Sequence, residues 1–471
     1  MKKQKKSRVK ASLACLFGII ILGVGLAVIY KNVNSEKDKL DMDSAVPEEE
    51  LESFYNSESE NDNRVLDKSL DDLELSLAGR GLTGNVIPYD GQERNIVCYG
   101  DSMTEGVGAS HAIINVDGEK LDISYWTYPD ALQYLTGIDT YNYGVSGEDS
   151  REIAVRAGGI KLYTDRDVVV GYNHSADVKV TDEYGELQYV QNFGGYGNAY
   201  DDYYGVVYID GQMFSLTGTS FNDEEWAYDI VDLSLKRYDD IIEDDSLNQS
   251  DYDESNAIVE DNSNVEESTE VLQNETKMYI TASEAMELYG VDYYEEFEFD
   301  DDTCIVIPAG TLVTPKAALD HSNDILILEI GSNGGWQGDY AKLIEQYDSI
   351  IERFGSPYYI IVGDTDDPGD SADPNQGMKD ENGKWIGIFE TYWETALRQA
   401  FGDHFFNTRV YMLTNGLSDA GKITTQRDLN NIKKGKIPKK LRADWTHFNS
   451  LGYYSKAMGI YQKGIELGYW D

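Results

Sequence analysis

Basic residues are scarce in this sequence. It carries 39 lysines and arginines against 86 aspartates and glutamates, a formal net charge of −47 at pH 7. Because contact with nucleic acid or an acidic lipid surface requires clustered Lys and Arg, neither is an expected partner. The sequence also lacks a phosphate-binding glycine loop and a redox cofactor motif, so we expect catalysis without a cofactor.

Cysteine is almost absent. The three cysteines, Cys15, Cys98 and Cys304, are too few to form an even disulfide framework. We interpret all three as structural residues, with a disulfide between Cys98 and Cys304 as the less favoured alternative.

The N-terminus joins a basic stretch to a long apolar run. Residues 1–10 (MKKQKKSRVK) form a basic tail, and residues 11–30 carry no charge. Because a span across a bilayer needs roughly 20 apolar residues, residues 11–30 predict a transmembrane signal anchor. The lysines should hold residues 1–10 in the cytoplasm, which places the rest of the chain outside at the cell membrane. Secretion after signal cleavage is the alternative, although no small-x-small cleavage pattern follows the run.

The remaining chain divides by composition. Residues 31–77 are acidic and poor in aromatic side chains, which predicts a disordered stalk. In residues 78–160 and 318–471, strand-like and helix-like patterns alternate, which predicts an α/β fold in three layers, a parallel sheet with helices on both faces. Strands are expected at residues 95–99, 324–330, 358–362 and 409–414 and up to about Val145, and helices at residues 125–135, 340–354, 385–401 and 451–467.

Residues 161–317 interrupt this alternation with short runs rich in tyrosine and β-branched residues, which predict an inserted β-rich module. Asp210 and Gly211, between YGVVYI and QMFSL, predict a tight hairpin in it. Within the module, residues 239–276 are low in apolar residues and their charges are almost purely acidic, which predicts a disordered loop.

Three short motifs follow predicted strands. Ser102, in Gly-Asp-Ser-Met-Thr, comes directly after the strand IVCY, at the edge where open α/β sheets bind ligands. Gly147, in NYGVSGE, can bring a backbone N–H close to a reacting group, and the amide of Asn333 can point into the same crevice. Taken singly, Ser102 also fits ordinary turn chemistry and Asn333 also fits a helix cap.

A fourth motif, Asp444-Trp-Thr-His447, precedes the last predicted helix. One turn places both side chains on the same side, so Asp444 can accept from one imidazole nitrogen while the other faces the serine. The other four histidines are read as surface or packing residues: His111, His174, His321 and His404.

The order Ser102, Gly147, Asn333 and Asp444/His447 resembles the sequence blocks that name the SGNH hydrolases, the GDSL-type esterases and lipases. The resemblance covers about residues 95–156 and 323–467 and implies a flavodoxin-like SGNH hydrolase core. It implies that Ser102 is the nucleophile, His447 the general base and then acid, and Asp444 the residue that orients His447. The backbone N–H groups of Ser102 and Gly147 and the Asn333 side chain would form the oxyanion hole.

The sequence departs from this pattern where many family members follow the asparagine with aspartate. Here Gly334, Gly335 and Trp336 follow, so we expect a wider pocket with the Trp336 indole at its rim, binding substrate. The acidic loop at residues 363–369 (GDTDDPG) comes just after a strand, which makes a calcium site there the less favoured alternative; it lacks the spacing of a calcium loop, so no metal is expected. No Gly-x-Ser-x-Gly elbow occurs, which argues against the α/β-hydrolase fold.

These features predict a membrane-anchored extracellular serine esterase that removes acetyl or other short acyl groups through an acyl-enzyme. The expected substrate is an acylated glycan or another cell-envelope polymer, because aromatic residues are abundant and aromatic faces stack on sugar rings. One alternative is an esterase of the lipase or lysophospholipase type. Another is a surface protein that binds a glycan or a protein and uses the hydrolase core as a scaffold.

Overall fold

The computed structural model describes residues 42–59, 86–116, 118–171, 176–185, 203–220, 230–237, 278–289, 303–363 and 384–470. Several predicted segments lie outside these ranges: the basic tail at residues 1–10, the anchor at residues 11–30, residues 31–41 and 60–77 of the stalk, the acidic loop at residues 239–276 and nearly all of the loop at residues 363–369. Among the described residues, no helix has the length and apolarity that a membrane span requires.

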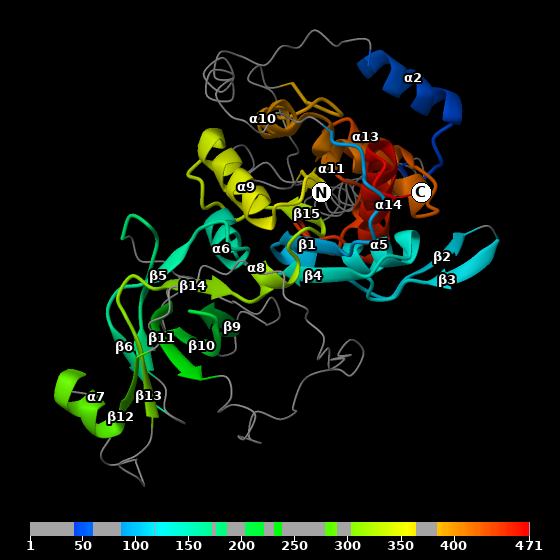
Figure 1. Cartoon of the computed structure of the whole chain (residues 1–471). Helices are drawn as coiled ribbons and strands as arrows, with labels where there is room; N and C mark the ends of the chain where they lie inside the picture. Colours follow the sequence, from blue (N-terminus) through cyan, green and yellow to red (C-terminus); the bar gives the residue numbers. More distant parts are fainter. Residues whose placement is uncertain are drawn as a thin grey trace, which may run out of the picture.

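A five-stranded parallel sheet forms the centre of the fold (Figure 1), as the alternation of elements predicts. Its middle strand, β1, pairs in parallel with β15 on one side and β4 on the other, so the segments before and after the insertion build one sheet. The order is β17, β16, β15, β1 and β4, with bounds Phe405–Phe406, Tyr359–Val362, Ile325–Glu329, Ile96–Gly100 and Thr140–Gly144.

Helices cover both faces of this sheet. Successive side chains of a strand point to opposite faces, and Ile96 and Cys98 accordingly belong to one apolar cluster while Val97 and Tyr99 belong to another. On the first face lie α5 (Tyr128–Thr136), α11 (Thr408–Thr414) and α14 (Ser450–Leu467); on the second lie α6 (Ser150–Arg156), α9 (Tyr340–Phe354) and α10 (Tyr392–Phe401). The smaller helices are α4 (Ser102–Glu105), α8 (Ala317–Asp320), α12 (Gly416–Asp419) and α13 (Gln426–Ile432), with 3-10 turns at Gly402–His404 and Lys439–Leu441.

One predicted strand is wrong. Residues 409–414 form most of α11, a helix, and the strand at this edge is the two-residue β17 just before it. The β-branched and aromatic residues of this segment suggested a strand, but Asn407 caps a helix by accepting a 3.0 Å hydrogen bond from the N–H of Val410. The helix expected from residue 385 starts only at Tyr392, after a capping box formed by Thr391 and Glu394.

The described residues between the two halves of the sheet form a β-rich module, drawn in green below α6 in Figure 1. The predicted hairpin is confirmed: Asp210 and Gly211 both have positive φ, 50° and 73°, and join two antiparallel strands. The elements are β5 (Leu162–Thr164), β6 (Val168–Val170), β7 (Ala176–Val178), β8 (Val180–Thr181), β9 (Tyr203–Ile209), β10 (Gln212–Ser220), β11 (Ile230–Arg237), β12 (Met278–Thr281), α7 (Ala282–Tyr289), β13 (Thr303–Ile307) and β14 (Leu312–Pro315).

The module continues the core of the fold at α6. Val155 of α6 packs in the same buried cluster as Leu162 and Val313 of the module. Outside the module, β2 (Ile113–Val116) and β3 (Glu119–Asp122) form a separate hairpin. Cys98 and Cys304 are buried in different sheets and no disulfide joins them, so the alternative of a bridge does not hold.

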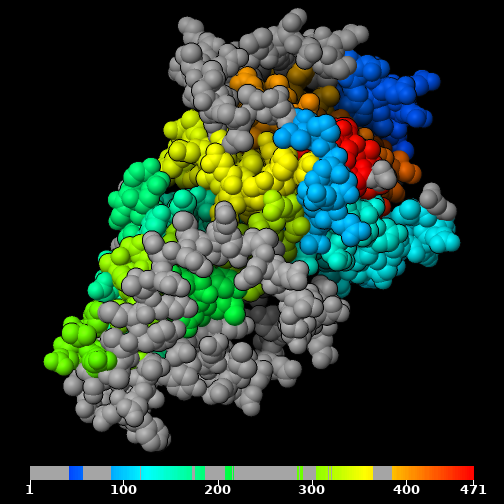
Figure 2. Space-filling view, viewed as in Figure 1, coloured from blue at the N-terminus to red at the C-terminus, as the bar shows by residue number. Residues whose placement is uncertain are grey.

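Part of the expected stalk is folded. Residues 48–59 form α2 (Glu48–Ser59), which is the blue segment lying against the orange and red C-terminal part of the molecule in Figure 2. The Val46 N–H donates to the Thr424 carbonyl at 3.0 Å, and the Tyr55 hydroxyl donates to the Leu413 carbonyl at 3.1 Å. The prediction of disorder was wrong here because a few apolar side chains, Phe54 and Tyr55 among them, are enough to order the segment when they pack against an existing core.

Candidate active site

Ser102 begins the one-turn helix α4 directly after β1. The buried Asp101 side chain caps this helix by accepting a 2.9 Å hydrogen bond from the N–H of Met103. A glycine is required at position 100, because a Cβ there would lie 2.1 Å from Oγ1 of Thr104. The chain can therefore turn sharply and leave the Ser102 hydroxyl at the carboxyl end of the central strand.

The structure brings Ser102, His447 and Asp444 together in one hydrogen-bonded chain. Nε2 of His447 lies 2.9 Å from Oγ of Ser102, and Nδ1 of His447 lies 2.8 Å from Oδ2 of Asp444. The second carboxylate oxygen of Asp444 accepts from the N–H groups of Thr446 and His447 at 2.8 and 2.7 Å. This is the connectivity in which a carboxylate orients an imidazole and the imidazole takes a proton from a serine.

The environment keeps Asp444 ionised. Partial burial raises its pKa, but the hydrogen bonds from the His447 side chain and from the N–H groups of His447 and Thr446 outweigh this effect. The pKa of Asp444 is therefore held below its ordinary value. An ionised Asp444 can stabilise the imidazolium that forms when His447 accepts a proton.

Close contacts hold the turn that carries His447 against the segment after Ser102. Gly108 has a φ of +90°, and a Cβ at this position would lie 2.6 Å from Cβ of Ala443 and 3.2 Å from Cβ of His447. Two hydrogen bonds flank this contact: the Tyr453 hydroxyl donates to the Val107 carbonyl at 2.7 Å, and the Ser110 N–H donates to Oγ of Ser450 at 2.9 Å.

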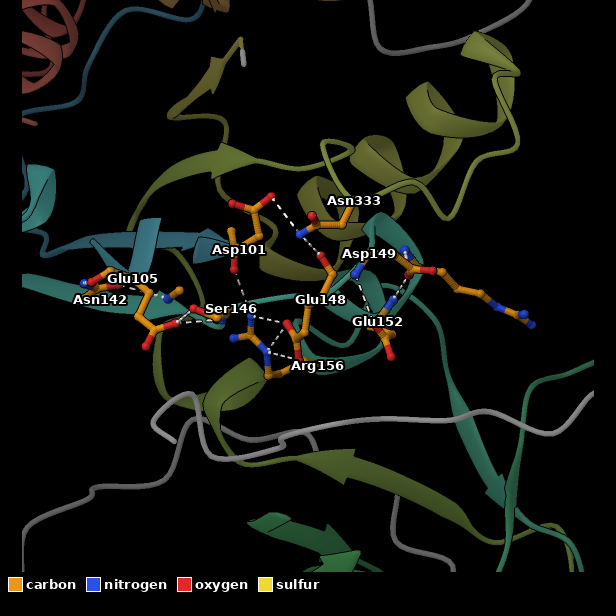
Figure 3. A network of polar contacts seen from close by, with 12 residues as sticks. Asp101, Glu105, Asn142, Ser146, Glu148, Asp149, Glu152, Arg156 and Asn333 are labelled. Atoms are coloured by element: carbon orange, nitrogen blue, oxygen red, sulfur yellow. Dashed lines mark hydrogen bonds and ion pairs between the residues drawn. The ribbon is translucent and has the colours of Figure 1, made fainter. Parts of the chain in front are cut away.

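The three expected oxyanion donors lie at the ends of neighbouring strands, but they are not equally available. Within the described residues, neither the Ser102 nor the Gly147 N–H donates to another group. The amide nitrogen of Asn333 donates to the Glu148 carbonyl at 3.0 Å and more weakly to the Asp101 carboxylate at 3.4 Å (Figure 3). To stabilise an oxyanion, the Asn333 amide would give up its long hydrogen bond to Asp101 and donate to the anion instead.

A side chain from α4 fixes the loop that carries Gly147. The Glu105 carboxylate accepts hydrogen bonds from both the N–H, at 2.7 Å, and the hydroxyl of Ser146 (Figure 3). Gly144 allows this approach, since a Cβ there would lie 2.0 Å from the backbone nitrogen of Glu105. The loop with Gly147 is therefore held to the same short helix as Ser102.

Trp336 is not at the rim of the pocket. Its side chain is only 4% exposed, its indole N–H donates to the Gly331 carbonyl at 2.9 Å, and its ring packs against Tyr340 and Trp393. The expectation was wrong because the glycines before Trp336 let the chain fold back and bury the ring. The tryptophan that follows Asp444 in the sequence, Trp445, is 63% exposed.

Two buried ion pairs near the site were not predicted from the sequence. Arg156 pairs with Glu148 at 2.7 Å, and Lys456 of α14 pairs with Glu329 at the end of β15. All four side chains are at most 2% exposed. The one available signal was Glu329, a charged residue in the otherwise apolar run ILILEI.

The other described histidines serve packing or surface contacts, as expected. His404 is buried with Nδ1 2.9 Å from the Tyr359 carbonyl, and His321 lies between the Tyr143 hydroxyl and Asp324. His111 is exposed and contacts Ser124. His174 lies outside the described residues.

Among the described residues, no group of three or more His, Cys, Asp or Glu side chains could hold a metal ion. Comparisons with protein-family models, with curated proteins and with solved structures found no match. The functional conclusion therefore rests on the geometry of the site and on the motifs that build it.

Proposed function

We propose that the protein is a serine esterase of the SGNH (GDSL-type) hydrolase kind that cleaves short acyl esters. One observation carries the proposal: Ser102 and the Asp444/His447 pair, which are distant in sequence from each other, form a continuous hydrogen-bonded chain with spacings of 2.9 and 2.8 Å. The position of Ser102, at the carboxyl end of the central parallel strand, is where open α/β sheets bind ligands and supports the same proposal.

In the first step, Oγ of Ser102 attacks the ester carbonyl carbon while Nε2 of His447 takes the hydroxyl proton. The carbonyl oxygen becomes an anion that the N–H groups of Ser102 and Gly147 and the Asn333 amide would stabilise, each donor by about 3 kcal/mol. His447 then gives its proton to the alcohol oxygen as the ester bond breaks, which leaves an acyl group on Ser102. Water attacks this acyl-enzyme with His447 as base and releases the acid.

The proposal is tested by turnover of an activated acetyl ester. Ser102→Ala should abolish hydrolysis and covalent labelling by a fluorophosphonate, while its unfolding transition matches that of the wild type. Ser418→Ala is the control and should hydrolyse the ester normally, because within the described residues its hydroxyl hydrogen bond goes to the Asn415 carbonyl, just before the same short helix. Wild-type turnover in Ser102→Ala would refute the assignment.

The exposed indole of Trp445 favours an acylated glycan as the substrate. Because His447 protonates the alcohol oxygen of the leaving group, the alcohol part of the ester must lie on the His447 side of the site. Trp445 lies in the same turn, between Asp444 and His447, and the residue is 63% exposed. A flat amphipathic ring in this position suits a sugar ring that carries the ester.

A comparison of kcat/KM for different esters distinguishes an acylated glycan substrate from a lipid substrate and from a binding function. We expect the purified folded part to release acetate from acetylated oligosaccharides with a higher kcat/KM than it shows for long-chain glycerol or phospholipid esters. A preference for long chains would replace the glycan with a lipid substrate. Glycan binding without hydrolysis of any of these esters would instead support a binding protein that uses the hydrolase core as a scaffold.

We also propose that residues 11–30 anchor the protein in the cell membrane, with the catalytic part outside. Because residues 42–59 are packed on the fold, only residues 31–41 would join it to the anchor. A fully extended segment of this length reaches at most about 40 Å, at about 3.6 Å per residue. The enzyme would therefore act close to the membrane surface, and proteolysis of intact cells within residues 31–41 should release active protein.

A further inference from the structure

We infer that Arg156 is a positioning residue that holds the three oxyanion donors in place. The inference rests on the proposed esterase function, because it assigns a role in that reaction. Arg156 ends α6, and its side chain is fully buried against the strand ends that carry the site. Figure 3 shows it beneath Glu148, Asp101 and Asn333.

Arg156 and Glu148 form a buried pair joined by several hydrogen bonds. Nε of Arg156 donates to the two carboxylate oxygens of Glu148 at 3.1 and 2.9 Å, and Nη2 donates to one of them at 2.7 Å. Both side chains are 0% exposed. Stability alone is a weak reason for such a pair, because an apolar pair of similar volume often stabilises a core as well or better.

The contacts of this pair lie at or next to each proposed donor. Nη2 of Arg156 donates to the Gly100 carbonyl at 3.3 Å, two residues before Ser102. The hydrogen bonds from Arg156 to the Glu148 carboxylate hold Glu148, which directly follows Gly147. The backbone carbonyl of Glu148 accepts the 3.0 Å hydrogen bond from the Asn333 amide.

Arg156 thus bonds directly to the end of β1 and to Glu148 after β4, and it reaches the Asn333 amide after β15 through the Glu148 backbone. Each of these three strand ends supplies one proposed donor. Oxyanion donors act by being fixed before charge develops, so a small displacement of any of them weakens transition-state stabilisation without weakening substrate binding. Loss of Arg156 should therefore lower kcat and leave KM largely unchanged.

The chain contains a matched pair for comparison. Arg409 donates to the two carboxylate oxygens of Glu394 at 2.6 and 2.7 Å and also to the Gly387 carbonyl at 2.8 Å. The Arg409 and Glu394 side chains are 1% and 5% exposed. This pair joins α10 to α11 and contacts none of the proposed donors, so it has the same chemistry without the same neighbours.

The experiment compares Arg156→Met with Arg409→Met, each assayed per folded molecule on an activated acetyl ester. Both variants lose a buried ion pair and should unfold at lower temperature than the wild type. Only Arg156→Met should show the kinetic effect, a fall in kcat of about 10- to 100-fold at similar KM, against 10²- to 10³-fold for the removal of a whole donor. Arg156→Lys, which keeps the charge but not the fork of donors, should restore part of kcat.

Two results would overturn the inference: wild-type kcat in folded Arg156→Met, or an equal fall in kcat in Arg409→Met. If Arg156→Met does not fold, Glu148→Gln decides, since it keeps the size of the side chain and the backbone carbonyl that Asn333 uses. An unchanged kcat in Glu148→Gln then contradicts the role of the pair. Failure of the esterase proposal itself is recognised separately, by Ser102→Ala hydrolysing the ester as fast as the wild type.

Discussion

The replacement of Gly108 by alanine tests how closely the Ser102 and His447 segments must approach. Gly108 takes no part in the hydrogen bonds that join Ser102, His447 and Asp444, yet its missing side chain makes room for the turn that holds His447. A Cβ at this position would lie 2.6 Å from Cβ of Ala443, 2.6 Å from the Phe448 carbonyl oxygen and 3.2 Å from Cβ of His447. Backbone atoms and short side chains form this contact, so they cannot rotate away from the added methyl group.

The size of the effect follows from these distances. Nonbonded carbon atoms prefer a separation of about 3.5 Å or more, so the turn must move by about 1 Å. The same movement lengthens the 2.9 Å contact between Ser102 and His447 beyond hydrogen-bond range. A misplacement of about 1 Å at a reacting centre costs about 100-fold in rate, which is the expected fall in kcat/KM. The positive φ and the overpacking together should lower the free energy of unfolding by about 2 to 4 kcal/mol.

Gly137→Ala is the matched control for this prediction. Gly137 also has a positive φ, +70°, but its added Cβ would meet nothing within 4 Å. This variant should lose about 1 kcal/mol of stability from backbone strain and keep wild-type kcat/KM. The assays are urea unfolding and hydrolysis of an activated acetyl ester per folded molecule. If Gly108→Ala keeps kcat/KM within twofold of the wild type, the proposed dependence of the triad on this contact is incorrect.

Three further predictions concern Asp444, Glu152 and the segment before the catalytic fold. Asp444→Asn should lower kcat by about 10²- to 10⁴-fold, because the amide cannot stabilise the imidazolium; steady-state kinetics near neutral pH measure this, and a loss below twofold would contradict the role of Asp444. Burial, with the neighbouring Glu148 and Asp149, raises the pKa of Glu152 from 4.5 to about 9. Between these values the folded protein binds a proton that the unfolded chain releases, so the group lowers stability as the pH rises. Glu152→Gln should therefore be more stable than the wild type at pH 8, with a gain that shrinks toward pH 5 in urea titrations; an equal gain at both pH values would exclude this cause. Removal of residues 1–59 should lower the midpoint of thermal unfolding relative to removal of residues 1–41, because Val46, Phe54 and Tyr55 lose their contacts with the core; identical midpoints would show that α2 adds no stability.

Local patterns in the sequence were sufficient for most of the central fold. The predicted helix at residues 340–354 coincides with α9 and the predicted strand at residues 324–330 contains β15, because amphipathic period and buried β-branched runs are local signals. The predicted strand at residues 409–414 was wrong because the β-branched and aromatic residues favour a strand, whereas the Asn407 cap starts a helix there. The prediction of disorder for residues 42–59 was wrong because their few apolar side chains pack against a core formed by residues far away in sequence.

The sequence by itself identified the residues that form the candidate site, since Ser102 and Asp444/His447 stand in short motifs at predicted strand ends. It could not decide which indole is exposed: Trp336 is buried against Trp393, whereas Trp445 faces solvent. Nor could it reveal that Arg156 bonds to both Glu148 and Gly100. Burial and hydrogen-bond partners depend on strands that are distant along the chain and adjacent only after the parallel sheet has formed, so only the tertiary structure decides them.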